Sequence, residues 1–388
     1  MADYPITAFA ACNALGRSTV EVLAALDAGR PGVGPCPPEF GVTATCGVVP
    51  GQLPPLPAGL ADFDTRLTRI ALLSLVDLDA PLAAARERWG ASRVAVLLGT
   101  STGGIHESER AYAYARAHGG ALPPGYSVER SHALHAGLHA VRTLAGAGGP
   151  SYLVSTACSS SAKVCAAAIR LLDAGLCDAV LAGGVDSLCQ MTLRGFAGLE
   201  VLSPAPCRPF SSARAGINIG EGAAWVLVER RGEGPARLLG VGESSDAYHM
   251  TSPHPEGLGA FLAMKRALDA GGLAPSAIDH VNVHGTGTLQ NDAVEGKAIR
   301  ELLGEHTAVV ATKGYTGHLL GAAGATEIVF TIAAIAGGYL PASVGADPVD
   351  TSIGVAVNVA RRPFRTRAAL SNSFAFGGSN VSVLLGAP

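Results

Sequence analysis

The feature that most constrains the fold is a series of short apolar runs separated by alanine-rich stretches. The runs are residues 93–98, 152–155, 179–182, 224–229, 280–283, 309–311, 355–359 and 381–385. Their unbroken apolar character predicts strands that are buried on both faces. Helical patterns begin near residue 65 and recur at 162–174 and 260–270. This alternation predicts an α/β fold in which helices cover both faces of a mixed sheet.

The composition excludes two broad classes of protein. Of the 388 residues 48% are hydrophobic and only 15% are charged, a balance opposite to that of long disordered regions. The formal net charge is -3, and the chain has no run of lysine or arginine, which argues against nucleic-acid binding. Proline and glycine are frequent in residues 31–60 and predict a surface loop there. A change of composition at 230–235 predicts two halves, residues 1–235 and 236–388.

Three further features predict a cytoplasmic protein. The first residues lack the basic start and apolar core of a signal peptide. The most apolar stretch, residues 328–336, is much shorter than the roughly 20 residues needed to cross a bilayer, so no membrane insertion is expected. The 8 cysteines form no C-x-x-C pair, which is typical of reduced thiols in a chain too long to need disulfides.

One cysteine stands out from the others. Cys158 lies in S-T-A-C-S-S-S (155–161), between a predicted strand and a predicted helix. The free N–H groups and the positive end of the helix dipole favour a thiolate, so this position predicts a lowered pKa. Its small neighbours leave room for a substrate. Cys165, Cys177 and Cys189 lack this setting and are expected to be small buried hydrophobes.

Two histidines occupy glycine-rich turns that follow predicted strands. His284 lies in V-H-G-T-G-T (283–288), and His318 lies in T-K-G-Y-T-G-H-L-L-G-A-A-G-A (312–325). The glycines allow backbone and substrate to approach each imidazole closely. Lys313 and Glu327 flank His318 and are expected to hold charge and orient the histidines. The turn N-S-F-A-F-G-G-S-N (372–380) offers backbone N–H groups to a developing oxyanion.

Together these motifs resemble those of the elongating β-ketoacyl-acyl-carrier-protein synthases, which are condensing enzymes of the thiolase superfamily. Further matching motifs are A-G-G-V-D-S, R-P-F-S-S-A-R-A-G-I-N-I-G-E-G-A and S-D-A-Y-H-M-T-S-P. The resemblance covers essentially the whole chain. It implies a thiolase-like, five-layered α-β-α-β-α fold built from two similar halves and normally dimeric, with no cofactor and no metal ion.

The resemblance also implies a role for each motif. Cys158 would carry the acyl chain as a thioester. His284 and His318 would assist decarboxylation of a malonyl donor and stabilise the enolate, and Lys313 and Glu327 would support that electrostatic arrangement. The reaction implied is a decarboxylative Claisen condensation that yields a 3-oxoacyl carrier and CO2. The implied partner is an acyl carrier protein whose phosphopantetheine bears the acyl and malonyl groups.

The same family implies an oxyanion hole and an acyl pocket. The backbone N–H groups of Cys158 and Phe376 would form the oxyanion hole, and the Phe376 ring would gate malonyl entry. Thr102, Tyr126 and Phe196 would line the acyl pocket. Thr102 stands where a bulky aliphatic gate is usual, and the segment around Tyr126 is unusually polar. These departures suggest, as an alternative function, a ketosynthase of a specialised polyene or polyketide pathway.

Few basic residues stand at the positions that would bind the acidic carrier protein. Arg66 and Arg69 are the basic residues expected at the docking surface, while Glu200 stands where the family usually has an arginine. The implied assembly is a homodimer or a heterodimer with a related, noncatalytic ketosynthase-like subunit, a chain-length factor. Such a subunit would supply the missing basic contacts.

Three other functions compete with this reading. A serine hydrolase is suggested by G-T-S-T-G (99–103), but the Asp-then-His order that it needs downstream cannot be assigned. A thiolase needs a second catalytic cysteine near the C-terminus, and none follows Cys207. A noncatalytic chain-length partner normally lacks the nucleophile, which is present here. Ketosynthases that start chains on acyl-CoA usually have asparagine where His318 stands.

A histidine triplet could suggest a metal site. His132, His135 and His139 have the spacing of one helical face, but no carboxylate joins them at a ligand-like position. We therefore expect a helix that faces solvent or an interface, and no metal ion.

Overall fold

The structure is a computed structural model that describes residues 3–388. Its main sheet has 11 strands in the order β13-β11-β10-β15-β16-β9-β1-β8-β6-β4-β5. These strands are β1 (Tyr4–Asn13), β4 (Val94–Gly99), β5 (Ser151–Val154), β6 (Ala179–Asp186), β8 (Gly222–Glu229), β9 (Ala236–Ser245), β10 (His280–Asn282), β11 (Ala308–Val310), β13 (Ala356–Val357), β15 (Ala368–Phe374) and β16 (Ser379–Gly386).

The sheet repeats one pattern on either side of the β1–β9 pair. On one side β5, β4 and β6 are parallel, and β8 and β1 follow antiparallel. On the other side β13, β11, β10 and β15 are parallel, and β16 and β9 follow antiparallel. The turn at 230–235 joins β8 to β9 and so connects the two patterns.

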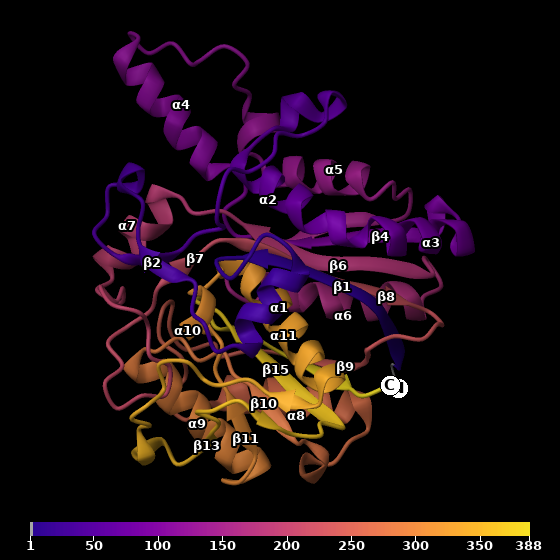
Figure 1. Ribbon diagram of the computed structural model, residues 1–388, viewed down its shortest axis with the longest axis vertical. Coiled ribbons are helices and arrows are strands. Elements are labelled where there is room, and N and C mark those ends of the chain that lie inside the picture. The colour runs from indigo at the N-terminus through magenta and orange to yellow at the C-terminus, as the bar shows by residue number, and fades with distance from the viewer. Residues whose placement is uncertain (1–2) are drawn as a thin grey trace.

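Helices cover and separate the two parts of the sheet, as Figure 1 shows. The helices are α1 (Thr19–Asp27), α2 (Arg66–Leu75), α3 (Asp79–Trp89), α4 (Ile105–Ala117), α5 (Leu134–Leu144), α6 (Ser160–Asp173), α7 (Gln190–Gly198), α8 (Leu258–Gly271), α9 (Leu289–Leu303), α10 (Lys313–Thr316) and α11 (Ala323–Gly337). Helices α2, α3 and α5 cover one outer face, α8 and α9 cover the other, and α6 and α11 lie in the middle. The predicted α/β fold with five layers is confirmed.

The two middle helices approach each other closely. The Ser161 hydroxyl of α6 accepts a hydrogen bond of 2.9 Å from the backbone N–H of Ala325 in α11. A Cβ atom on Gly324 would lie 2.9 Å from the Cβ of Ala162, a distance that no real pair of Cβ atoms tolerates. Glycine at 324 therefore lets the two helices, and with them the two parts of the sheet, pack at this spacing.

Three strands of the main sheet were not predicted. β1 and β9 include small or polar residues that interrupt any continuous apolar run. β15 contains the buried residues Ser371, Asn372 and Ser373, whose polarity hides the strand. The carbonyl oxygen of the Asn372 side chain accepts a 2.8 Å hydrogen bond from the Ser382 hydroxyl of the neighbouring strand. The Asn372 side chain is tolerated in this core because partners inside it satisfy its polar groups, whereas the Ser371 and Ser373 hydroxyls are buried without a partner among the described residues.

Two local predictions were wrong. Residues 31–60 are not only a surface loop, because β2 (Val33–Pro35) and β3 (Thr45–Gly47) form a small sheet with β7 (Ile219–Gly220). The run at 152–155 is not buried on both faces, since β5 is the last strand of the main sheet and Tyr152 is 40% exposed. An unpaired strand edge of this kind is normally covered or protected.

The remaining short strands, β12 (Tyr339–Leu340) and β14 (Arg362–Pro363), pair with each other. One helical segment of the described residues, Leu320–Gly337, is long and apolar enough to cross a membrane. In this fold 89% of that segment is buried inside the protein. The segment is therefore part of the core.

Candidate active site

Cys158 lies in the tight turn between β5 and α6, where the sequence placed it. Ala157 has a φ of 52°, a left-handed conformation that is unfavourable for a residue with a Cβ. The Ala157 carbonyl accepts hydrogen bonds from both the N–H and the hydroxyl of Ser160, at 3.1 and 2.6 Å. These contacts hold the strained turn that presents the thiol at the start of α6.

The acidity predicted for this thiol is wrong. Burial raises the pKa of Cys158 to about 12, because the free energy needed to remove a thiolate from water exceeds the stabilisation that nearby groups provide. The charge of Lys313 and the backbone N–H groups of Cys158 and Phe376 lower the pKa and only partly offset burial. The resting group is therefore a thiol. The two N–H groups that act on its sulfur are those expected for the oxyanion hole.

His284 and His318 lie together beside this thiol. Each follows a parallel strand of the second half, β10 for His284 and β11 for His318. Their ring centroids are 5.3 Å apart and their planes meet at 85°. Burial, followed by the charge of Lys313, lowers the pKa of both imidazoles well below the usual range. Both rings are neutral at physiological pH.

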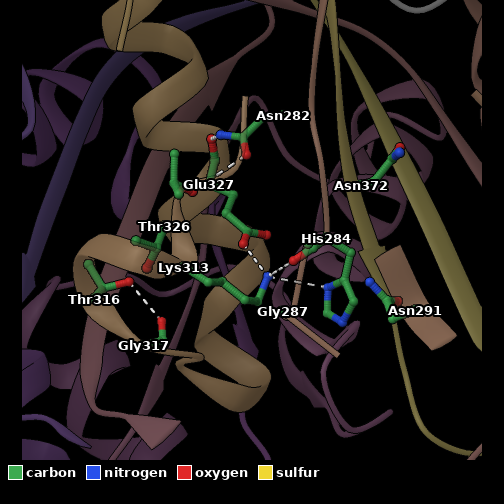
Figure 2. A network of polar contacts seen from close by, with 12 residues as sticks. Asn282, His284, Gly287, Asn291, Lys313, Thr316, Gly317, Thr326, Glu327 and Asn372 are labelled. Atoms are coloured by element: carbon green, nitrogen blue, oxygen red, sulfur yellow. Dashed lines mark hydrogen bonds and ion pairs between the residues drawn. The ribbon is translucent and has the colours of Figure 1, made fainter. Parts of the chain in front are cut away.

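Lys313 fixes the orientation of His284 (Figure 2). Its ammonium lies 3.3 Å from Nδ1 of His284 and donates to the His284 carbonyl oxygen and to the carboxylate of Glu327. An ammonium only donates, so Nδ1 accepts and the ring proton of His284 is on Nε2. In contrast, both ring nitrogens of His318 are buried and without a partner in the described chain. Both ring nitrogens of His318 can therefore form hydrogen bonds to a substrate.

Glu327 is the buried counter-ion of Lys313. Burial raises the pKa of Glu327 to about 7, and the lysine opposes that rise. Both side chains are almost completely buried, so the pair is screened little by salt. The Lys313–Glu327 pair thus lies next to the His284 ring. The supporting role of Lys313 and Glu327 in the reaction stays a prediction.

Two buried carboxylates of α9 support the His284 turn and were missed in the sequence. Glu295 accepts hydrogen bonds from the backbone N–H groups of His284 and Gly285, at 2.8 and 2.9 Å. Asp292 accepts one of 3.2 Å from the N–H of Gly287. Burial raises the pKa of Glu295 to about 7. Their spacing of one helical turn was the available signal, because it puts both acids on one face of the helix.

A third buried carboxylate, Asp186 at the end of β6, lies at the G-T-S-T-G turn. It accepts hydrogen bonds from the Thr102 hydroxyl and N–H, both at 2.8 Å, and from the N–H of Gly321. It also accepts from the N–H of Ser101, whose own hydroxyl is buried without a partner in the described residues. Within residues 3–388 Ser101 has no hydrogen bond to a histidine, so these residues do not form the arrangement of a serine hydrolase.

One pocket brings three of the predicted catalytic residues together. It has a volume of about 510 Å³, and its walls include Cys158, His284, His318, Phe196 and Phe376. The rings of Phe196 and Phe376 stack with centroids 5.7 Å apart. Phe376 thus lines the same pocket as the thiol, and its role as a gate stays a prediction.

Thr102 and Tyr126 do not line this pocket. The Thr102 hydroxyl is held by Asp186, and the Tyr126 hydroxyl lies 2.8 Å from the hydroxyl of Ser108. The role of these two residues in an acyl pocket stays a prediction.

The two arginines expected to dock a carrier are already paired with carboxylates. Arg66 makes a two-point contact with the buried Glu221, including an Nε–O distance of 2.7 Å. Arg69 makes a similar contact with Asp64, at 2.6 and 2.7 Å. Their role in docking stays a prediction.

The histidine triplet does not form one helical face. His132 ends a separate helical turn (Val128–His132), Ala133 is extended, and His135 and His139 belong to α5. All three side chains are exposed. Across residues 3–388 no group of three or more histidine, cysteine or acidic side chains has the arrangement of a metal site.

Comparison with known proteins identifies the family of the chain. The family model for the N-terminal domain of β-ketoacyl synthases matches residues 58–233, and that for the C-terminal domain matches residues 235–347. The chain is 31% identical to a 3-oxoacyl-[acyl-carrier-protein] synthase 2 of Coxiella burnetii, over 98% of this chain and 97% of that one. A mitochondrial synthase of Arabidopsis thaliana is 40% identical, but the match spans 61% of this chain and only 56% of the relative.

Solved structures share the whole fold. A chain from the complex of a ketosynthase (ApeO) with its chain length factor (ApeC) from Xenorhabdus doucetiae superposes with a TM-score of 0.91 and 36% identity. That match covers 100% of this chain and 98% of the other. A β-ketoacyl synthase from Burkholderia phymatum superposes with a TM-score of 0.89 and 28% identity. The chain therefore belongs to the β-ketoacyl synthase family.

Proposed function

We propose that this protein is a β-ketoacyl-acyl-carrier-protein synthase, which condenses an acyl thioester with malonyl-carrier and releases CO2. The observation that carries the proposal is that Cys158, His284 and His318 line one pocket, with both imidazoles neutral. A thiol acts as the nucleophile in acyl transfer, and neutral imidazoles donate hydrogen bonds to an anion without being deprotonated.

The first step loads the acyl group. The sulfur of Cys158 attacks the thioester carbonyl of the acyl carrier, and the bond between that carbonyl and the pantetheine sulfur breaks. The proton of the Cys158 thiol passes to the departing sulfur, so the carrier leaves as a free thiol. The N–H groups of Cys158 and Phe376 stabilise the oxyanion that forms in between.

The second step forms the carbon–carbon bond. The malonyl carboxylate loses CO2, and the electron pair of the broken bond remains on the thioester as an enolate. The N–H groups of His284 and His318 donate to the enolate oxygen. The enolate carbon then attacks the acyl group on Cys158, whose sulfur leaves as a thiolate and takes up a proton from the solvent.

The proposal is tested with acyl-carrier and malonyl-carrier as substrates. Mass spectrometry should detect a 3-oxoacyl carrier that is two carbons longer than the starting acyl group. Release of free acid would instead indicate a hydrolase, and no change in either carrier would indicate a binding protein. Either result would overturn the proposal.

A second candidate is a ketosynthase that extends polyene or polyketide chains with a chain-length factor as partner. It is favoured by the full-length similarity to a chain of the ketosynthase–chain length factor complex. The Thr102 hydroxyl, held by Asp186 where an aliphatic gate is usual, also favours it. Competition between saturated and conjugated acyl carriers of equal length tests this candidate, which requires that the conjugated chain be accepted.

We also propose that the open edge of β5 pairs with a second ketosynthase-like chain, in a homodimer or a heterodimer, in the cytoplasm. The exposed Tyr152 on this last strand supports the proposal, because such edges are normally covered. Light scattering on the purified chain tests it. A dimer mass supports self-pairing, and a monomer that dimerises only with a chain-length factor supports the heterodimer.

A further inference from the structure

The mouth of the active-site pocket is lined by large apolar side chains that face solvent. Leu199, Met250, Leu289 and Phe376 all line the pocket and are between 38% and 75% exposed. Single exposed apolar residues are common on proteins, but several around one opening indicate an interaction surface. We call these four residues the apolar rim.

The apolar rim is assembled from four separate segments of the chain. Leu199 follows α7, Met250 lies between β9 and α8, Leu289 begins α9, and Phe376 lies in the turn between β15 and β16. Two of these segments are tied together, because the N–H of Gly377 donates a 2.7 Å hydrogen bond to the Met250 carbonyl oxygen. All four residues line the pocket that holds Cys158, so the rim lies beside the route to the thiol.

Among the described residues that line the pocket, no lysine or arginine side chain is exposed. The exposed Glu200 follows Leu199 directly and adds negative charge. Arg214 also lines the pocket, but its side chain is only 6% exposed and is paired with Asp350 at 2.6 Å. The two arginines expected at a docking surface, Arg66 and Arg69, are each held by a carboxylate.

We propose that the acyl carrier protein docks on the apolar rim through an apolar face, and that ion pairs contribute little to its binding. This inference rests on the proposed function, because it takes an arm-borne thioester as the substrate. The arm has to enter through the mouth to reach Cys158, so the protein that bears the arm sits on the rim. Apolar contact depends weakly on ionic strength, whereas docking on a basic patch falls steeply as salt screens it.

The experiment measures how fast Cys158 becomes acylated, by intact-protein mass spectrometry. Two donors are compared: octanoyl-pantetheine, and an octanoyl-loaded acyl carrier protein of a bacterial fatty-acid system. The ratio of the two rates, carrier over pantetheine, isolates the contribution of docking. Between about 0.05 M and about 0.5 M NaCl we expect this carrier ratio to change by less than roughly twofold.

A double variant tests the rim itself. Met250→Ser with Leu289→Ser removes two of its exposed apolar side chains, and we expect the carrier ratio to fall by about tenfold. The matched control is Val20→Ser, which changes an apolar residue that is 78% exposed on α1, outside the pocket. The control should keep both rates. Circular dichroism melting of each variant confirms that the fold is retained.

Each other outcome overturns a defined part of the argument. A carrier ratio that falls steeply with salt and in Arg69→Gln, but survives in the double variant, overturns apolar docking in favour of a basic patch. Acylation by octanoyl-pantetheine without acylation by the carrier also overturns it. Failure of both donors to acylate Cys158 contradicts the proposed function instead.

Discussion

The ring of His318 meets that of His284 nearly at a right angle, with centroids 5.3 Å apart. Only His284 is held through its ring by another side chain, since Nδ1 lies 3.3 Å from the Lys313 ammonium. His318 has two unpartnered ring nitrogens in the described chain. The pair thus combines one donor of fixed tautomer with one whose tautomer the substrate can select.

Replacing Cys158 and Ser101 in turn should show which of the two residues is the nucleophile. Cys158→Ala should abolish acylation and condensation, because no other thiol lines the pocket among the described residues. Ser101→Ala is the control and should retain a substantial rate, since the backbone N–H of Ser101 makes the contact to Asp186. Acyl loading followed by intact mass decides this, and loss of activity in the serine variant alone would reverse the assignment.

Removing either imidazole should affect the donor side of the reaction. His284→Ala and His318→Ala should each lower malonyl decarboxylation by about 10²–10³, the usual effect of losing one oriented donor to an oxyanion. Cys158 should still be acylated in both variants. Release of CO2 from malonyl-carrier is the measurement. Unchanged release in both variants would exclude these histidines from the donor site.

The high pKa of the resting thiol predicts how it reacts with alkylating agents. Below a pKa of about 12 the thiolate fraction of Cys158 rises by about tenfold per pH unit. The rate of alkylation by iodoacetamide should therefore climb from pH 7 to pH 9 without a plateau. Lys313→Met should slow it further, because the lysine charge lowers the pKa. A plateau near neutral pH would mean that the helix dipole outweighs burial.

A buried histidine away from the pocket predicts sensitivity to acid. Burial lowers the pKa of His280 to about 4, so between pH 6.5 and 4 the unfolded chain binds a proton that the folded chain does not. Its stabilising contribution is fully present above pH 6.5 and is lost as the pH falls toward 4, by roughly 3 kcal/mol in all. Urea unfolding of wild type and His280→Gln at several pH values measures this difference. A gap between them that does not vary with pH would contradict it.

The anchored hydroxyl of Thr102 predicts a change in chain preference. Thr102→Ile replaces a group that bonds to Asp186 with a larger aliphatic one, and should shift selectivity from conjugated toward saturated acyl carriers by roughly tenfold. Thr102→Val, which replaces the hydroxyl with a methyl group of similar size, is the matched control for the hydrogen bond. A preference for saturated chains in the wild type that Thr102→Ile leaves unaltered would remove Thr102 from the acyl pocket.

The sequence located the reacting groups better than it described their environment. Cys158, His284, Lys313 and His318 could be found because each lies at the end of a strand, in a turn of small residues that local sequence shows. The pKa of the thiol could not, since burial by segments far apart in the chain determines it. The same limit hid β15, because Ser371 and Asn372 look like loop residues until the fold buries them and gives the Asn372 side chain its partners, Ser382 on β16 and Glu295 on α9.

The support of the His284 turn illustrates the same limit. Glu295 is ordinary in sequence, an acid in a helix that carries other charges. Only the fold places its carboxylate under two backbone N–H groups of the His284 turn. Thr102 shows the converse, since its identity was noticed but its bond to Asp186 connects residues 84 apart in sequence.

The close contact between α6 and α11 has a consequence for the reaction. The nucleophile belongs to the first half of the sheet and the imidazoles to the second, so no single element carries both. Their alignment is set where Gly324 meets Ala162, and a side chain at 324 would act as a wedge between the two halves. A wedge there changes the distance over which the new bond must form while leaving every reacting group intact. The absence of a methyl group at position 324, in the middle of the molecule, thus helps to set the distance between the reacting groups of the active site.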